Sequence, residues 1–180
     1  SMYSGRYGNI YTVRQLLQLA QEVAGERKPS NYIFKKNGKY FDALRPSIEP
    51  DGFEEEEEVI NNRKFHVEKV KKIFKKMDLF IFTLGLTEMW LHKESGTVYP
   101  TAPGTIVGEY DKEIYEFRNA TFEEIKNDFY EFQSLVKKIR FDKPFLILLT
   151  VSPVPLTATA SGKHVLFSTT YSKAVLRAVA

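Results

Sequence analysis

The sequence predicts an α/β protein built around parallel strands, and three features of the chain support this fold class. Two unbroken apolar runs, 78–84 and 145–151, have the length and composition of strands that are buried on both faces. Between them lies an amphipathic segment that opens with the capping box Thr121–Glu124. A strand, a crossover helix and a second strand form a βαβ unit, in which both strands point the same way.

The composition limits the class of protein. The chain has 180 residues, enough for one domain, which we expect to span 1–180. Its 26 basic and 23 acidic residues nearly balance, so nothing calls for nucleic acid or a membrane surface as a partner. There is no cysteine, which excludes disulfides and thiolate metal sites and fits a cytoplasmic protein. The histidines show no metal-ligand spacing and no glycine pattern marks a nucleotide site, so we expect no cofactor and no metal.

The first part of the chain predicts two helices and a hairpin. Thr12–Gln15 is a capping box that begins a helix, and Gly25 can end it in the left-handed conformation. Asn37-Gly38, between apolar pairs, predicts a hairpin with a type I′ turn. The acids of 54–58 and the lysines of 69–76 complement the dipole of one long helix, which we prefer to a partner-binding acidic tail.

The segment 85–119 is rich in Gly, Pro, Thr and Tyr and predicts a long loop with one short strand at 114–117. A last helix is predicted to begin at Thr169 or Thr170. Gly85–Trp90 and Ser152–Leu156 both leave the carboxyl ends of the predicted parallel strands. They therefore mark the edge at which open α/β sheets bind their ligands.

Two parallel strands cannot cover their own edges and faces. We therefore expect the natural protein to continue past Ala180 and to begin before Tyr3. For the chain as it stands, we expect that its hairpins serve as extra strands, that it forms a homodimer through exposed sheet edges, or that it is only marginally stable.

A family resemblance rests on six segments in order along the chain. They are Tyr7–Thr12 with Arg14–Leu17, Arg45-Pro46 with Glu49–Phe53, Phe82–Trp90, Tyr99–Thr105, Leu149–Leu156 and Thr170–Arg177. Together they resemble the GSCFA family, which is similar to SGNH (GDSL-type) hydrolases. The resemblance implies an incomplete SGNH-like (flavodoxin-like) three-layer α/β/α fold with parallel central strands.

The same resemblance implies a reaction. In the SGNH scheme the serine of the Gly-Ser-Cys-Phe-Ala motif is the nucleophile, and an Asp-x-x-His near the C-terminus supplies acid and base. Neither motif occurs in this chain. We therefore assign no catalytic nucleophile or base to these residues and expect the chain to be inactive by itself.

Candidate oxyanion donors also follow from the resemblance. Gly85–Glu88 stands where SGNH enzymes carry Gly-x-Asn-Asp, so Thr87 replaces the amide that donates to the oxyanion. The candidates are the Gly85 N–H, the Thr87 hydroxyl and the Asn9 side-chain amide. The alternative for Gly85 and Thr87 is a tight turn between strand and loop.

Further candidates lie near the same edge. Glu88 is predicted to orient a loop, to fix an arginine or to act in catalysis, and Trp90 either packs the loop or forms a substrate platform. His92 lies close enough in sequence to reach the same pocket. Ser152 follows the second strand, with His164 twelve residues on, but the proline after Ser152 removes the N–H that would follow a nucleophile.

Two functions of different classes remain open. The first is an SGNH-like esterase or acyltransferase acting on O-acyl groups, foremost O-acetyl, of a bacterial polysaccharide or a small ester. The second is a non-catalytic carbohydrate- or protein-binding domain that keeps the pocket of the fold. His66, in the charged helix, is expected to be a surface or packing residue under either hypothesis.

Overall fold

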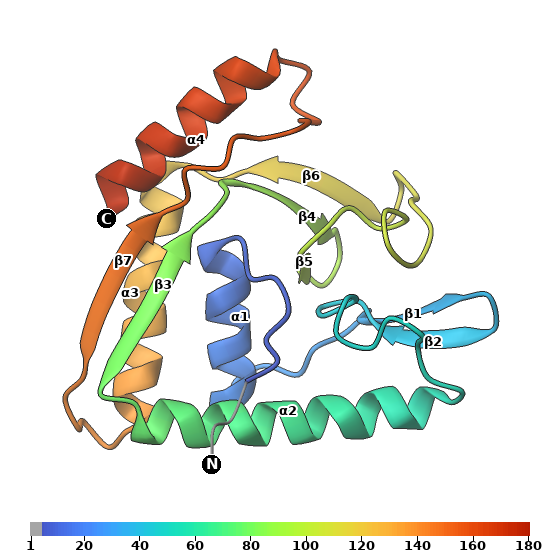
Figure 1. Cartoon of the computed structure of the whole chain (residues 1–180), viewed down its shortest axis with the longest axis horizontal. Helices are drawn as coiled ribbons and strands as arrows, with labels where there is room; N and C mark the ends of the chain where they lie inside the picture. The colour runs from blue at the N-terminus through green and yellow to red at the C-terminus, as the bar shows by residue number, and fades with distance from the viewer. Residues whose placement is uncertain (1–4) are drawn as a thin grey trace.

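The structure is a computed structural model that describes residues 5–180. Its helices are α1 (Val13–Ala24), α2 (Glu56–Lys76), α3 (Phe122–Ile139) and α4 (Val165–Val179). Its strands are β1 (Ile33–Lys36), β2 (Lys39–Asp42), β3 (Leu79–Leu84), β4 (Glu88–His92), β5 (Val98–Tyr99), β6 (Tyr115–Asn119) and β7 (Leu146–Val151). Within the described residues these form a β1–β2 hairpin, a β3–β7 pair and a sheet of order β5-β4-β6. Figure 1 shows α2 along the base, β3 and β7 on one side of α1, and the hairpin on the other.

The local signals in the first part of the chain are confirmed. Thr12 and Gln15 form a reciprocal capping box, and Gly25 ends α1 with φ +80°. In the hairpin, Asn37 and Gly38 have φ values of +50° and +79°, as a type I′ turn requires. The acid run begins α2 as expected, and this helix ends with lysines in its last turn.

The βαβ unit is also confirmed. β3 and β7 pair in parallel, with Leu79 opposite Leu146 and Leu84 opposite Val151. The α/β class therefore holds. α4 begins at Val165, earlier than the predicted Thr169 or Thr170, because the His164 side chain caps it by accepting from the Leu166 N–H.

The predicted long loop is in fact a small antiparallel sheet. β4 pairs with β5 and β6, and only β6 coincides with the predicted short strand. In β4, Met89 and Leu91 belong to the main core, whereas Glu88 and Trp90 point to the other side of the sheet. The loop prediction missed this strand because its polar and aromatic residues face a cavity and break the apolar pattern.

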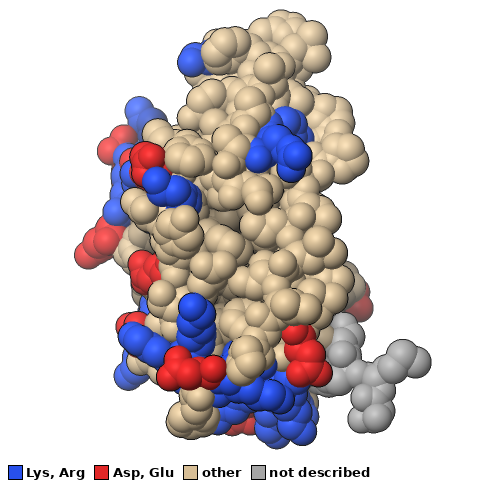
Figure 2. All heavy atoms as spheres, turned by 90° about the vertical axis from the view of Figure 1, so that its left-hand side faces the viewer, with Lys and Arg blue, Asp and Glu red and all other residues tan. Residues whose placement is uncertain are grey.

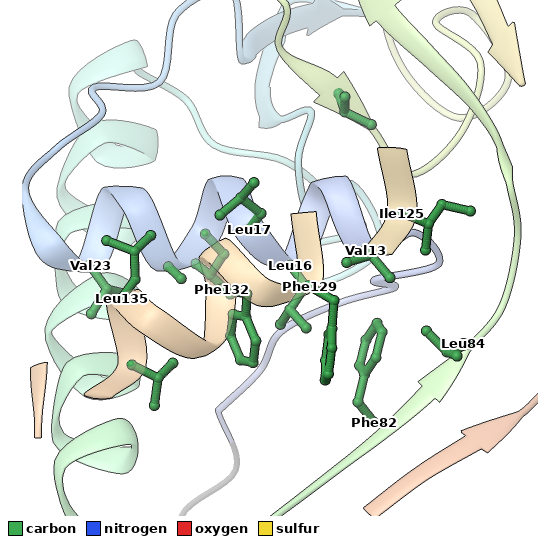
Figure 3. Close-up of a cluster of buried hydrophobic side chains, with 14 of the residues drawn as sticks. Val13, Leu16, Leu17, Val23, Phe82, Leu84, Ile125, Phe129, Phe132 and Leu135 are labelled. Atoms are coloured by element: carbon green, nitrogen blue, oxygen red, sulfur yellow. The ribbon is translucent and has the colours of Figure 1, made fainter. Parts of the chain in front are cut away.

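The main core joins α1, α3 and the inner face of β3, as Figure 3 shows. Phe82 of β3 lies next to Phe129 of α3, with Leu84 and Phe132 on either side of this pair, and Phe132 has no exposed surface. This packing positions the carboxyl end of β3 beside the N-terminus of α1. The candidate site lies at that junction.

The expectation that β3 and β7 are buried on both faces is wrong. Their outer face carries exposed apolar side chains, among them Ile81 at 58% and Leu146 at 71% exposure, and Leu79 and Leu148 lie beside these two. The face of the molecule that carries β7 accordingly shows few charged side chains over its centre (Figure 2). Within residues 5–180, helices cover only the inner face of the strand pair, so a second helical layer is not formed by these residues.

A buried ion network joins the hairpin to α1 and α2. The Arg63 guanidinium donates to both carboxylate oxygens of Glu22 and to Asp42, and Arg45 donates to Asp42 at 3.0 Å. Burial opposes ionisation of Asp42, but the two guanidiniums outweigh it and lower its pKa. Apolar periodicity in the sequence could not reveal this network, because the network places an arginine, Arg63, on the buried face of α2.

Candidate functional site

A cavity of about 560 Å³ opens at the carboxyl ends of β3 and β7. Both sequence-predicted segments line it, Gly85 with Glu88 and Trp90 from the first and Ser152 from the second. The other walls come from the start of α1, from the segment after β5, from β6 and from the loop after β7. The cavity thus lies at the edge at which parallel sheets bind ligands.

The turn after β3 is hydrogen-bonded to Tyr11, the residue before the N-cap of α1. The backbone N–H groups of Gly85 and Leu86 both donate to the Tyr11 carbonyl oxygen, at 3.2 and 2.9 Å. A Cβ atom at Gly85 would lie 2.8 Å from that oxygen, which explains why this position requires glycine. Because the Gly85 N–H is engaged with Tyr11, it is not free to stabilise an oxyanion in this structure.

Helix α4 holds the same turn from the other side. The Lys173 ammonium donates to the Gly85 carbonyl at 2.9 Å, and the Ser172 hydroxyl accepts from the Thr87 N–H at 3.2 Å. Burial lowers the pKa of Lys173. The neighbouring Tyr171 hydroxyl donates to the Ala120 carbonyl, where β6 leads into α3. Three consecutive residues of α4 therefore fix the backbone at the base of the cavity.

One wall of the cavity is an aromatic strip that crosses three strands. Trp90 on β4 stands opposite Tyr99 on β5 and Phe117 on β6, so the three rings lie on one face of the sheet. All three line the cavity. Trp90 meets Phe117 and Tyr110 edge to face, with ring centroids 5.6 and 5.3 Å apart. We call Trp90, Tyr99 and Phe117 the aromatic strip.

Glu88 lies on the same strand and the same face as Trp90. Its side chain is only 8% exposed, and Oε1 accepts a hydrogen bond of 2.7 Å from the Thr159 hydroxyl. Thr159 contacts the Ser161 hydroxyl, which in turn contacts Ser168 on α4. This chain of hydroxyl groups fixes the loop after β7 over the cavity.

The segments that build this cavity belong to a chain that matches a known family over its whole length. The model of the GSCFA family matches residues 1–180. This chain belongs to the GSCFA family. No curated protein and no solved structure matches it.

The six GSCFA segments have distinct places in the fold. Four of them line the cavity, through residues at the start of α1, after β3, after β5 and after β7. The segment that contains Arg45 belongs to the buried ion network, and the last one supplies the α4 residues that hold the turn. Most of the segments on which the resemblance rests therefore line one cavity or hold its base.

Three of the predicted site residues do not line the cavity at the carboxyl ends of β3 and β7. The Thr87 side chain is 1% exposed, and its hydroxyl has no partner among the described residues. Asn9 is exposed, and its carbonyl accepts from the Gln15 side-chain amide. His92 belongs to the turn after β4, where Nδ1 accepts from the Ser95 N–H at 3.2 Å. Their predicted roles in oxyanion binding or at the pocket stay predictions.

No imidazole of the described residues lines the cavity. His164 caps α4, and His66 is buried with Nδ1 2.9 Å from the Gly5 carbonyl oxygen. Ser152 accepts from the Val154 N–H within its own turn. Residues 5–180 hold no cluster of three or more potential metal-ligating side chains. Among these residues no helix has the length and apolarity to span a membrane.

Sequence reasoning missed several cavity residues, notably Tyr11, Tyr99, Phe117 and Thr159. Tyr11 and Tyr99 lie within family segments, so the resemblance carried a signal for them. Phe117 and Thr159 carried none, because their place at the cavity depends on strand register and on the course of a loop.

Proposed function

We propose that this cavity binds the substrate of an SGNH-like ester hydrolase or acyltransferase that acts on O-acyl groups, foremost O-acetyl groups of a carbohydrate. The observation that carries the proposal is the position of the cavity. It lies at the carboxyl ends of the parallel strands and is built mainly from segments on which the GSCFA resemblance rests. Ester cleavage in that scheme needs a bound carbonyl group, an activated nucleophile and donors for the developing oxyanion.

Residues 5–180 supply the substrate cavity in this proposal, and neither the nucleophile nor the base. Ser152 is the cavity residue with a candidate nucleophilic hydroxyl at the sheet edge, but it has no imidazole beside it. Its hydroxyl lies within a local turn and is followed by Pro153. The turn from Gly85 to Thr87 has its backbone N–H groups engaged with Tyr11 and Ser172. Its role is to shape the cavity floor.

A second function, non-catalytic binding of a carbohydrate, is favoured by one observation. The aromatic strip gives the cavity a wide apolar wall, and hydroxyl side chains stand around it. Such a surface can hold a sugar ring without any reaction.

Serine labelling and turnover distinguish the two functions. We would compare this chain with a GSCFA protein that carries both the Gly-Ser-Cys-Phe-Ala motif and the Asp-x-x-His pair, using p-nitrophenyl acetate and a serine-directed fluorophosphonate. We expect label and turnover in the longer protein and neither in the 180-residue chain. If neither protein reacts, the binding function is favoured. If the 180-residue chain is labelled and Ser152→Ala abolishes the label, the assignment of Ser152 to a passive role is wrong.

Binding is measured independently by tryptophan fluorescence. Trp90 is the single tryptophan of the chain and lines the cavity, so its emission reports on this site alone. We expect 6-O-acetylglucose to shift this emission at concentrations where glucose does not. Equal responses to the two sugars would show that the acyl group is not recognised.

A further inference from the structure

The electrostatic character of the cavity gives information about its ligand beyond the acyl group. The chain has 26 lysine and arginine residues, yet none of the described ones lines this cavity. Among the described residues that line the cavity, Glu88 carries the single charged side chain. A ligand with a carboxylate or phosphate group would therefore meet the Glu88 carboxylate, and the nearby Lys173 ammonium is already engaged with the Gly85 carbonyl.

Glu88 is unusual because it is a buried acid without a protein cation. No Lys, Arg or His nitrogen of residues 5–180 makes an ion pair with it, although its side chain is only 8% exposed. Thr159 donates to one carboxylate oxygen, and no described residue donates to the other. Buried carboxylates are normally paired, because removing an isolated charge from water is costly. The other buried acids illustrate the rule, since Asp42 is paired with Arg45 and Arg63, and Asp128 with Arg14.

The aromatic strip adds a second, independent preference for positive charge. Trp90 is on the same strand face as Glu88, two residues away, and Tyr99 and Phe117 flank it across the sheet. The faces of aromatic rings carry negative potential and attract cations, with tryptophan the most effective of the three. A carboxylate beside such rings is the arrangement that recognises ammonium groups.

We propose that the cavity recognises a positively charged nitrogen on its ligand, a protonated amine or a quaternary ammonium group, held between the Glu88 carboxylate and the aromatic strip. This inference rests on the proposed use of the cavity as the ligand site. It narrows the class of ligand to organic cations, and an acylated amino sugar with a free amine is one that would also satisfy the proposed function.

The test uses two probes of the same shape that differ only in charge, choline and its neutral carbon analogue 3,3-dimethylbutan-1-ol. Each is titrated into the 180-residue chain in an amine-free buffer, with Trp90 emission as the readout. We expect choline to bind at least about tenfold more tightly. Glucosamine and glucose form a second matched pair and should rank in the same order.

Variants assign the effect to Glu88. Glu88→Gln keeps the shape of the side chain and its ability to accept from Thr159, and we expect it to weaken choline binding about tenfold while changing the neutral analogue less than about twofold. Glu116→Gln is the matched control, because it removes the same charge from β6, on the opposite face of the sheet. Circular dichroism of both variants verifies folding, and the comparison of the two probes on the unaltered chain needs no variant.

Equal affinity for the two probes, tighter binding of the neutral one, or no choline binding in the millimolar range would overturn the inference. Unchanged choline affinity in Glu88→Gln would overturn it as well. These outcomes are separate from a failure of the proposed function, since no ester or turnover is involved. If this chain binds choline selectively but the longer protein is not labelled by the fluorophosphonate, the proposed cation site is supported and the proposed esterase activity is contradicted.

Discussion

Removing the Arg63 side chain should strongly destabilise the fold, because Arg63 is the link between three elements. It lies on α2 and donates to Glu22 on α1 and to Asp42 at the end of β2. The side chains of Arg63, Glu22 and Asp42 are 6%, 11% and 6% exposed. In Arg63→Met, Asp42 keeps Arg45 as its partner, but Glu22 loses its ion pair and retains the charge of Arg27 nearby.

The expected cost of Arg63→Met is about 3–5 kcal/mol in the free energy of unfolding, the usual result of removing one partner from a buried ion pair. For a domain of this size, each kcal/mol lowers the melting temperature by about 2–4 °C, so the midpoint should fall by about 6–20 °C. Urea unfolding followed by circular dichroism, with thermal melts as a second measurement, gives both quantities. A loss below about 1 kcal/mol would contradict the importance of the network.

A double variant separates charge from packing. Glu22→Gln in the Arg63→Met background removes the carboxylate that lost its ion pair, so the double variant should be more stable than Arg63→Met by itself. If the double variant loses as much stability as Arg63→Met and Glu22→Gln lose in total when each is measured singly, the cost of Arg63→Met comes from lost packing of the arginine stem. The electrostatic reasoning would then be wrong.

Three further predictions concern pH, the turn and the open face. Burial, with the guanidiniums near it, lowers the pKa of His66 to about 3, which is below the value in the unfolded chain. The neutral imidazole therefore contributes its full stabilisation above pH 6.5, and this contribution is lost as the pH falls toward 3. The free energy of unfolding should drop by about 2 kcal/mol between pH 7 and pH 5. His66→Asn should flatten that part of a urea-midpoint curve, and an unchanged curve would refute the assignment. Gly85→Ala should cost about 1–3 kcal/mol and shift Trp90 emission, because its Cβ would press on the Tyr11 carbonyl, and an unaltered melting temperature would show that the turn adapts freely. The exposed face of β3 and β7 should bind the dye ANS, and replacing both Ile81 and Leu146 with threonine should lower the dye fluorescence measurably; equal fluorescence would place the binding elsewhere.

Helix caps and turns could be predicted from the sequence because they depend on residues only a few positions apart. The capping boxes at Thr12 and Thr121, the left-handed Gly25 and the Asn37-Gly38 turn all depend on near neighbours in the chain. The two apolar runs predicted β3 and β7, and their parallel pairing followed from the helix between them. The same reasoning predicted the edge of the sheet at which the cavity lies.

Relations between distant segments were decided only by the tertiary structure. The strand β4 was not predicted because Glu88 and Trp90 face a cavity instead of an apolar core. The aromatic strip exists only through the register that places Tyr99 and Phe117 beside Trp90. The occupation of the Gly85 N–H by Tyr11 is likewise a contact across the fold.

The sequence by itself thus determined the helices, the parallel pair, the family and the edge where a ligand would bind. It could not determine which side chains reach that edge, or that Glu88 is buried there with no ion pair among residues 5–180. The physical reason is that helix caps, turns and apolar periodicity act over a few residues, whereas strand register, burial and charge pairing depend on side chains far apart in the chain.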